Sequence, residues 1–196
     1  MSLKSNIQIK KSIFVVIDMQ NDYCHEDGYC SKTDVENPMN SIAETIIDFI
    51  SIIKKKDAKV VYFKSNTELS SKHVVFKQFL SKNIICKKNT WGAEIYKVKP
   101  QEVFTKNSTS CFSNIDFLKY INYEGIDTVV LLGFQTPICI ESTARAGYDL
   151  KKRIILVTDL VGCRSKWLKF QDKTIELIDG FFGETISSSE LLNMLN

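Results

Sequence analysis

The chain has 196 residues, and short apolar runs alternate along it with longer amphipathic stretches. This alternation constrains the fold more than any other feature of the sequence. The apolar runs are rich in β-branched and aromatic residues and are apolar on both faces, which is typical of parallel strands covered on both sides. They predict six strands, at residues 12–18, 58–65, 102–106, 128–133, 153–159 and 183–187.

The stretches between these runs carry apolar residues on one stripe, as amphipathic helices do. Strands that alternate with helices favour an open α/β sheet. We therefore predict a single-domain, doubly wound α/β fold, a Rossmann-like three-layer sandwich whose six-stranded, mostly parallel sheet has helices on both faces. Residues 1–11 are expected to be an N-terminal extension and residues 12–196 the domain. The predicted helices are at 40–56, 70–82, 114–122, 137–152 and 165–181.

Composition argues against several classes of function. The net charge is only +3 and the lysines are scattered, which is unlike a protein that binds nucleic acid or a membrane surface. No segment approaches the ~20 apolar residues of a membrane span, and no secretory signal opens the chain. The six cysteines form no C-x-x-C pair, so we expect free thiols in a cytoplasmic protein rather than a zinc ribbon.

Three polar residues follow predicted strands, at the edge of the sheet where ligands bind in folds of this kind. Asp18 ends the first strand, Lys106 ends the third, and Cys139 follows the fourth at a predicted helix start. Taken singly, each has an ordinary interpretation, as a turn aspartate, an exposed lysine and a core cysteine. Their joint placement at one edge favours an active site.

These three side chains fit covalent catalysis. The thiolate of Cys139 would be the nucleophile, favoured by the helix N-terminus and by the ammonium of Lys106. Asp18 would accept the thiol proton and return it to the leaving group. Backbone N–H groups at the helix start would form an oxyanion hole, and water would cleave the thioester. The two histidines, His25 and His73, lie outside this set, so a Cys-His or Ser-His mechanism is not expected.

Five segments of the sequence, taken together, resemble the isochorismatase-like cysteine hydrolase superfamily. This superfamily also contains nicotinamidases, N-carbamoylsarcosine amidase and ureide or biuret amidohydrolases. The resemblance covers roughly residues 12–190, and the combination of segments is specific although each alone is weak. The segments are VVIDMQNDY (15–23), NTWGAEI (89–95), VFTKNSTSCF (103–112), GIDTVVLLGFQTPICIESTAR (125–145) and IILVTD (154–159).

The resemblance implies a catalytic triad of Asp18, Lys106 and Cys139, with Cys139 as the nucleophile. It also implies a non-proline cis peptide bond at Phe134–Gln135 and an oxyanion hole formed by the N–H groups of Gln135 and Cys139. Five further side chains become substrate-binding candidates, and for the four apolar ones ordinary core packing is an equal alternative. These candidates are Gln20, Tyr23, Trp91, Phe112 and Ile138.

Departures from the family pattern narrow the reaction. Nicotinamidases hold a metal through an Asp and histidines in the loop after the second strand, but here that loop reads FKSNTELSSKH, without a D-x-H pair. We therefore expect no metal and no cofactor. The prediction is a hydrolase that cleaves a C–N bond of a small amide, carbamoyl or ureide substrate through a Cys139 thioester. Alternatives are isochorismatase-type hydrolysis, a redox role for Cys139, or a catalytically silent family member.

The resemblance also bears on assembly. Members of the superfamily are commonly oligomers, so it implies a homo-oligomer, a dimer or tetramer. The predicted helix at 165–181 is apolar enough for an interface between copies, although packing on its own sheet would explain its composition equally well.

Overall fold

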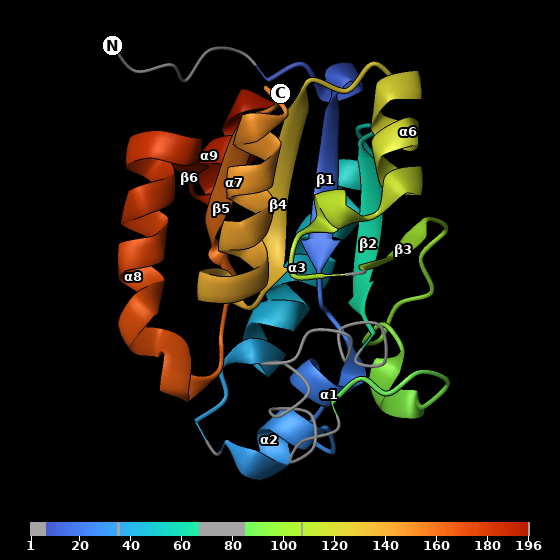
Figure 1. The fold of residues 1–196 in the computed structure, drawn as a ribbon, viewed down its shortest axis with the longest axis vertical. Coiled ribbons are helices and arrows are strands. Elements are labelled where there is room, and N and C mark those ends of the chain that lie inside the picture. The colour runs from blue at the N-terminus through green and yellow to red at the C-terminus, as the bar shows by residue number, and fades with distance from the viewer. Residues whose placement is uncertain (1–6, 35, 67–84, 107, 196) are drawn as a thin grey trace.

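The computed structural model describes residues 7–34, 36–66, 85–106 and 108–195, which contain one six-stranded sheet (Figure 1). The strand order is β3-β2-β1-β4-β5-β6, so the winding direction reverses between β1 and β4. Every neighbouring pair is parallel. The predicted doubly wound α/β fold is thereby confirmed. The strands are β1 (Ser12–Ile17), β2 (Lys59–Ser65), β3 (Val103–Lys106), β4 (Thr128–Phe134), β5 (Arg153–Gly162) and β6 (Glu184–Ile186).

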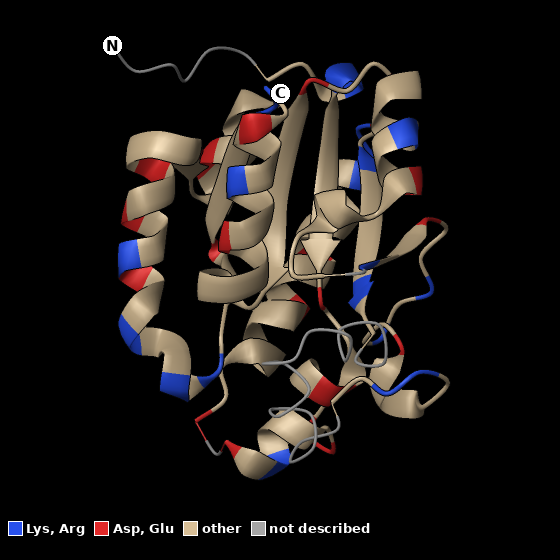
Figure 2. Ribbon diagram, viewed as in Figure 1, with Lys and Arg blue, Asp and Glu red and all other residues tan. Residues whose placement is uncertain are grey.

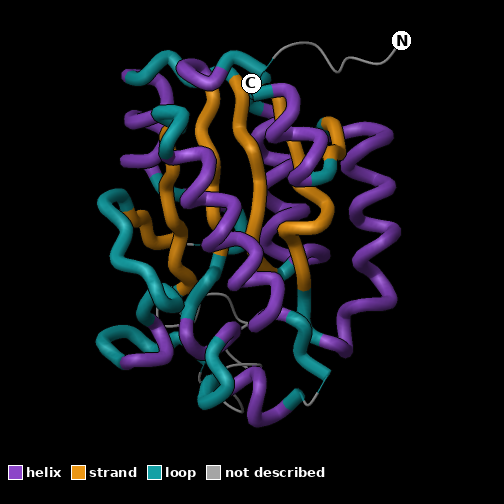
Figure 3. Tube along the Cα trace, turned by 180° about the vertical axis from the view of Figure 1, so that it is seen from behind, coloured by secondary structure: helices purple, strands orange, loops and turns teal. Residues whose placement is uncertain are grey.

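Helices cover both faces of this sheet. One face carries α6 (Ile115–Tyr123), α7 (Glu141–Asp149) and α8 (Leu168–Leu177), which stand in front in Figure 1. The opposite face carries α3 (Met39–Lys54), which crosses the strands in Figure 3, and α9 (Ser188–Met194). The shorter helices and helical turns are η1 (Ile9–Lys11), α1 (Asn21–Cys24), α2 (Tyr29–Thr33), η2 (Trp91–Ala93), η3 (Cys111–Ser113), η4 (Thr136–Ile140), η5 (Ser165–Trp167) and η6 (Ile178–Phe182).

Side chains that alternate along the strands build two apolar cores, one on each face of the sheet. In β1, Phe14 and Val16 belong to the core under α3, whereas Ile13, Val15 and Ile17 belong to the core under α6 and α7. All six residues of β1 are buried. Both faces of the central strands are therefore covered, which is why these strands are apolar throughout rather than alternating.

The elements differ from the predicted ones mainly at their ends. The predicted helix at 137–152 divides into the π-helical turn η4 and α7, and the one at 165–181 divides into η5, α8 and η6. β5 runs to Gly162, past the predicted end at residue 159 and past an irregularity in its pairing with β4. The sequence pattern does not predict α1, α2 or α9. The helix predicted at 70–82 lies outside the described residues.

The surface of the described part of the chain mixes charges of both signs. Figure 2 shows basic and acidic residues interspersed, for example along α8, where Lys169, Asp172, Lys173 and Glu176 follow one another. Among the described residues, no helix combines the length and the apolarity needed to cross a membrane.

Candidate active site

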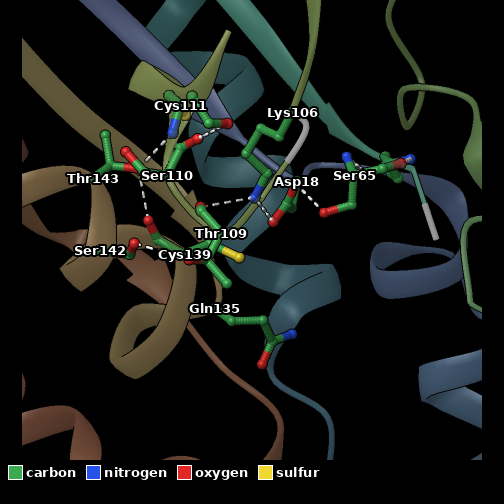
Figure 4. Close-up of polar contacts among 12 residues, drawn as sticks. Asp18, Ser65, Lys106, Thr109, Ser110, Cys111, Gln135, Cys139, Ser142 and Thr143 are labelled. Atoms are coloured by element: carbon green, nitrogen blue, oxygen red, sulfur yellow. Dashed lines mark hydrogen bonds and ion pairs between the residues drawn. The ribbon is translucent and has the colours of Figure 1, made fainter. Parts of the chain in front are cut away.

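Asp18, Lys106 and Cys139 come together at the carboxyl edge of the sheet (Figure 4). Asp18 follows β1 directly, Lys106 is the last residue of β3, and Cys139 lies in η4, the turn after β4. Lys106 Nζ lies 2.6 Å from Asp18 Oδ2, and the two side chains are 1% and 0% exposed. The strand ends thus assemble a buried ion pair beside a buried thiol.

The backbone at Asp18 is held in an uncommon conformation. Its φ of 55° is in the left-handed region, which a non-glycine residue rarely adopts and which occurs often at functional sites. The Asp18 N–H donates to the carbonyl of Phe63 in β2, and the Asp18 carbonyl accepts from the N–H of Gln20. The carboxylate then accepts the hydroxyl of Ser65 on Oδ1 at 2.8 Å. These contacts fix Asp18 between the ends of β1 and β2.

Electrostatics at Cys139 differ from what we expected for a thiol beside an ammonium. Burial raises the pKa of the Cys139 thiol to about 12, the charge of Lys106 lowers it, and the charge of Asp18 raises it. At Lys106, burial is the largest single cause and lowers the pKa, but the combined effects of Asp18, Cys139 and Cys111 raise it overall. In the resting state the site therefore holds a neutral thiol beside an ammonium–carboxylate pair, so the nucleophile needs a base to remove its proton.

Three backbone N–H groups of the turn η4 donate to a single carbonyl oxygen, that of Gln135. The oxygen of Gln135 accepts from the N–H groups of Ile138, Cys139 and Ile140 at 3.0, 3.0 and 3.3 Å. Catalysis with the Cys139 N–H in an oxyanion hole would require this N–H to exchange the Gln135 carbonyl for the oxyanion. The predicted cis bond at Phe134–Gln135 is wrong for this structure, because the described peptide bonds are all trans. The trans form is the one that a non-proline peptide ordinarily favours.

The side chain of Gln135 is also engaged within the protein. It is 5% exposed, its Nε2 donates to Met39 Sδ at 3.2 Å, and its Oε1 accepts from the N–H of Arg164 at 3.3 Å. Gln135 therefore connects the turn after β4 to the start of α3 and to the loop after β5. The predicted oxyanion role of its backbone N–H stays a prediction.

Hydroxyl groups tie the segment after β3 to the nucleophile turn. Thr143 Oγ1 donates to the Cys139 carbonyl at 2.7 Å and accepts from the N–H of Cys111 at 3.1 Å. Thr109 Oγ1 and Ser142 Oγ are 2.9 Å apart (Figure 4). The sequence analysis missed these residues, although the polar runs STSC and EST lie directly beside Lys106 and Cys139. Together they fasten the lysine-bearing segment to the helix that carries the thiol.

Two of the substrate-binding candidates lie at the site. Ile138 is half-buried and directly precedes Cys139 in η4. Burial raises the pKa of Tyr23, and the charges of Cys86, Asp18 and Cys139 raise it further. Both side chains also pack against the apolar cores, and their role in substrate binding stays a prediction.

The other three candidates have different surroundings. Phe112 is 6% exposed and packs against Phe117 in the core, with ring centroids 5.6 Å apart. Trp91 is 46% exposed and stands edge-on to His25 at 4.9 Å. Gln20 is buried, and its amide bonds to backbone atoms of Ser65 and Ala93. For Phe112 the structure favours core packing, and for Gln20 it shows a role in holding the loop.

No group of three or more His, Cys, Asp or Glu side chains that could hold a metal ion occurs within the described ranges. Most of the loop FKSNTELSSKH, including His73, lies outside those ranges.

The comparison with known protein families fits this geometry. The isochorismatase domain matches residues 12–190. The chain belongs to the isochorismatase family. This hydrolase is 27% identical over 165 residues to the uncharacterized isochorismatase family protein YddQ of Bacillus subtilis, covering 82% of each chain. It is 24% identical over 176 residues to ureidoacrylate amidohydrolase RutB of Azorhizobium caulinodans, covering 79% of this chain and 77% of that one.

Solved structures give the same fold for this isochorismatase-family chain. A cysteine hydrolase from Pseudomonas syringae pv. phaseolicola superimposes with a TM-score of 0.82 at 20% identity. The match covers 100% of this chain and 98% of the other. At this identity the likeness establishes the fold alone, so the reaction has to be argued from the side chains of the site.

Proposed function

We propose that this isochorismatase-family hydrolase cleaves a C–N bond of a small amide, carbamoyl or ureide substrate through a thioester on Cys139. The observation that carries the proposal is the buried Lys106–Asp18 ion pair of 2.6 Å beside that thiol. Burying an ion pair removes both charges from water, and this cost often cancels the stability gained from their attraction. A catalytic use explains why this one is kept at the edge of the sheet where ligands bind.

The proposed reaction begins with proton transfer. Asp18 removes the Sγ–H proton while Sγ attacks the substrate carbonyl, and Lys106 balances the charge of the carboxylate. When the tetrahedral adduct collapses, the C–N bond breaks and Asp18 returns the proton to the leaving nitrogen. Ammonia or an amine departs, and the acyl group stays on Cys139. Asp18 then removes a proton from water, whose oxygen attacks the thioester carbonyl. The C–S bond breaks, the acyl group leaves as its carboxylic acid, and Asp18 returns the proton to Sγ.

The relatives support an amide substrate. One of them is named as a ureidoacrylate amidohydrolase, and this chain brings Asp18, Lys106 and Cys139 together at the carboxyl edge of its sheet. Isochorismatase-type hydrolysis of a vinyl ether is the second candidate, because the whole family shares the fold. The two differ in their products, since only C–N cleavage releases ammonia or an amine.

The test is a panel of small primary amides, carbamoyl compounds and ureides, with release of ammonia or amine as the readout. We expect turnover of at least one compound by the parent protein and none by Cys139→Ala. Cys163→Ala is the matched control, because Cys163 is a buried thiol in the loop after β5 rather than at η4. Turnover that persists in Cys139→Ala would show that the proposed mechanism is wrong.

A further inference from the structure

Ser65 donates the second side-chain hydrogen bond to the candidate base. Its hydroxyl lies 2.8 Å from Asp18 Oδ1, while Lys106 Nζ lies 2.6 Å from Asp18 Oδ2. Figure 4 shows the Asp18 carboxylate between these two donors. Ser65 and Lys106 thus donate to different oxygens of the carboxylate, Ser65 as a neutral donor and Lys106 as a charged one.

The backbone of Ser65 is fixed, so its hydroxyl has a defined position. Ser65 pairs in register with Lys106 where β2 and β3 end. Its N–H donates to Gln20 Oε1 at 2.8 Å, and its carbonyl accepts from Gln20 Nε2 at 3.2 Å. Gln20 is fully buried and also donates to the carbonyl of Ala93 at 2.9 Å. These two hydrogen bonds hold the end of β2 against Gln20, two residues after Asp18.

We propose that Ser65 is a positioning residue for the general base Asp18, an inference that rests on the proposed function. Its O–H donates to the ionised carboxylate and thereby favours the form that can accept the Cys139 proton. A serine hydroxyl can also accept a hydrogen bond. When Asp18 carries the proton, the same pair can reverse direction, so the carboxyl group stays oriented through both halves of the reaction.

Several other groups face Asp18 and set the background for its protonation. Lys106 stabilises the charged form of Asp18 directly. The remaining neighbours are neutral at pH 7 because burial raises their pKa values, and each senses the Asp18 charge: Tyr23, Cys24, Cys86, Cys111 and Cys139. Without the Ser65 hydroxyl, the Asp18 carboxylate would keep its contacts with Lys106 and Cys139 and would lose its donor on Oδ1. Protonation of Asp18 would then become easier.

The test compares Ser65→Ala, Ser65→Thr and Ser12→Ala with the parent on an amide that the parent turns over. For Ser65→Ala we expect roughly a tenfold loss of kcat with little change in KM, and an acidic limb of kcat/KM that moves to higher pH. Ser65→Thr keeps the hydroxyl and should recover most of the activity. Ser12→Ala is the matched control, because the buried Ser12 hydroxyl bonds to Gln8 at the far end of β1.

A second measurement does not depend on turnover. Carbon-13 NMR of labelled aspartate, with Asp18 assigned by its absence from Asp18→Asn, follows the carboxyl group against pH. Protonation of Asp18 should occur at higher pH in Ser65→Ala than in the parent or in Ser12→Ala. If Ser65→Ala is insoluble, Ser65→Cys replaces it, since a thiol is a weaker donor of similar shape.

The outcomes separate this inference from the function on which it rests. If the parent turns over no amide, the proposed function fails, and the NMR titration still decides whether Ser65 acts on Asp18. An unchanged kcat, acidic limb and NMR titration in Ser65→Ala would overturn the positioning role. A loss of activity in Ser65→Ala that Ser65→Thr does not restore would also contradict it, because the hydroxyl would then not be the group that matters.

Discussion

At the residue scale, two charged neighbours act on the Cys139 thiol in opposite directions. Burial is the largest cause of its raised pKa, Lys106 lowers that pKa, and Asp18 raises it. Burial therefore keeps the thiol protonated, and Asp18 is the neighbouring group to which its proton could move. This arrangement differs from a thiolate that is permanently formed next to a cation.

Substitution of the two partners should change the reactivity of the thiol in opposite ways. Asp18→Asn removes the charge that raises the Cys139 pKa, so more thiolate forms at pH 7 and alkylation by iodoacetamide should be faster. Lys106→Met removes the charge that lowers this pKa, so alkylation should be slower. Each pKa unit corresponds to about a tenfold change in thiolate. The parent rate should keep rising above pH 10, because the pKa is about 12.

Peptide mapping by mass spectrometry gives the alkylation rate of each cysteine in these variants. Cys163 serves as the internal control, because burial and Asp34 raise its pKa and the triad does not contribute to the shift. Amide turnover should be lost in both variants even though alkylation moves in opposite directions. Alkylation that slows in both variants would contradict this account of the site.

At the element scale, β1 and β4 approach closely where they deliver Asp18 and Cys139. Gly133 near the end of β4 has φ 108°, and a Cβ there would lie 2.2 Å from the carbonyl oxygen of Ile17. Only glycine can adopt this positive φ and also leave room for the β1 backbone, because it has no Cβ. The close contact sets the spacing between the base and the nucleophile turn.

Gly133→Ala should therefore destabilise the protein by about 2–4 kcal/mol, through both backbone conformation and the clash with β1. Gly125→Ala is the matched control, because Gly125 also has positive φ, 61°, but an added Cβ would meet no atom within 4 Å. It should cost about 1–2 kcal/mol from the backbone alone. Urea unfolding of both variants measures the difference. Equal losses would mean that the contact with β1 has no energetic role.

Sequence patterns predicted the long elements better than the short ones. The strands were found within a few residues because burial on both faces makes them apolar throughout. Helical periodicity cannot distinguish the π-helical turn η4 from the α7 that follows, since both bury the same side. The four residues of α1 and five of α2 are too short for a period to show. For α9 a signal existed, the capping box of Ser187 and Glu190.

Part of the candidate site could also be predicted from the sequence. Asp18, Lys106 and Cys139 could be found because parallel strands bring their carboxyl ends to one edge. The hydroxyl donors Ser65, Thr109 and Thr143 could not, because serine and threonine are common in loops and only the folded contacts distinguish these ones. A cis bond at Phe134–Gln135 was predicted and a trans bond is found, because the prediction came from the family pattern rather than from the residues themselves.

At the scale of the whole molecule, one side of the described chain carries exposed apolar side chains. Phe170, Leu177 and Phe181 on α8 and η6 are 44%, 41% and 63% exposed, and Tyr148 on α7 packs against Phe181. Surfaces of this kind often mark an interface. The charges along α8 alternate in sign, so a second copy packed against it could pair basic with acidic side chains around the apolar contact (Figure 2). We propose that this surface joins copies in a homo-oligomer.

Light scattering on the purified protein should then give a mass of a dimer or larger assembly. The double substitution Leu177→Lys and Phe181→Glu should shift it to the monomer, because it places charges in the apolar contact. Ile115→Glu on α6 is the control, since Ile115 is 64% exposed on a different helix and should leave the mass unchanged. A parent protein that is already monomeric at high concentration would contradict the proposal.

The measurement that tests the central claim most directly is capture of the acyl-enzyme. The parent is mixed with an amide that it turns over, quenched with acid within one turnover, and digested for peptide mapping. The account predicts an added mass equal to the acyl group of the substrate on Cys139, removable by hydroxylamine as a thioester is. Turnover with no acyl group on Cys139, or with the acyl group on another residue, would contradict it.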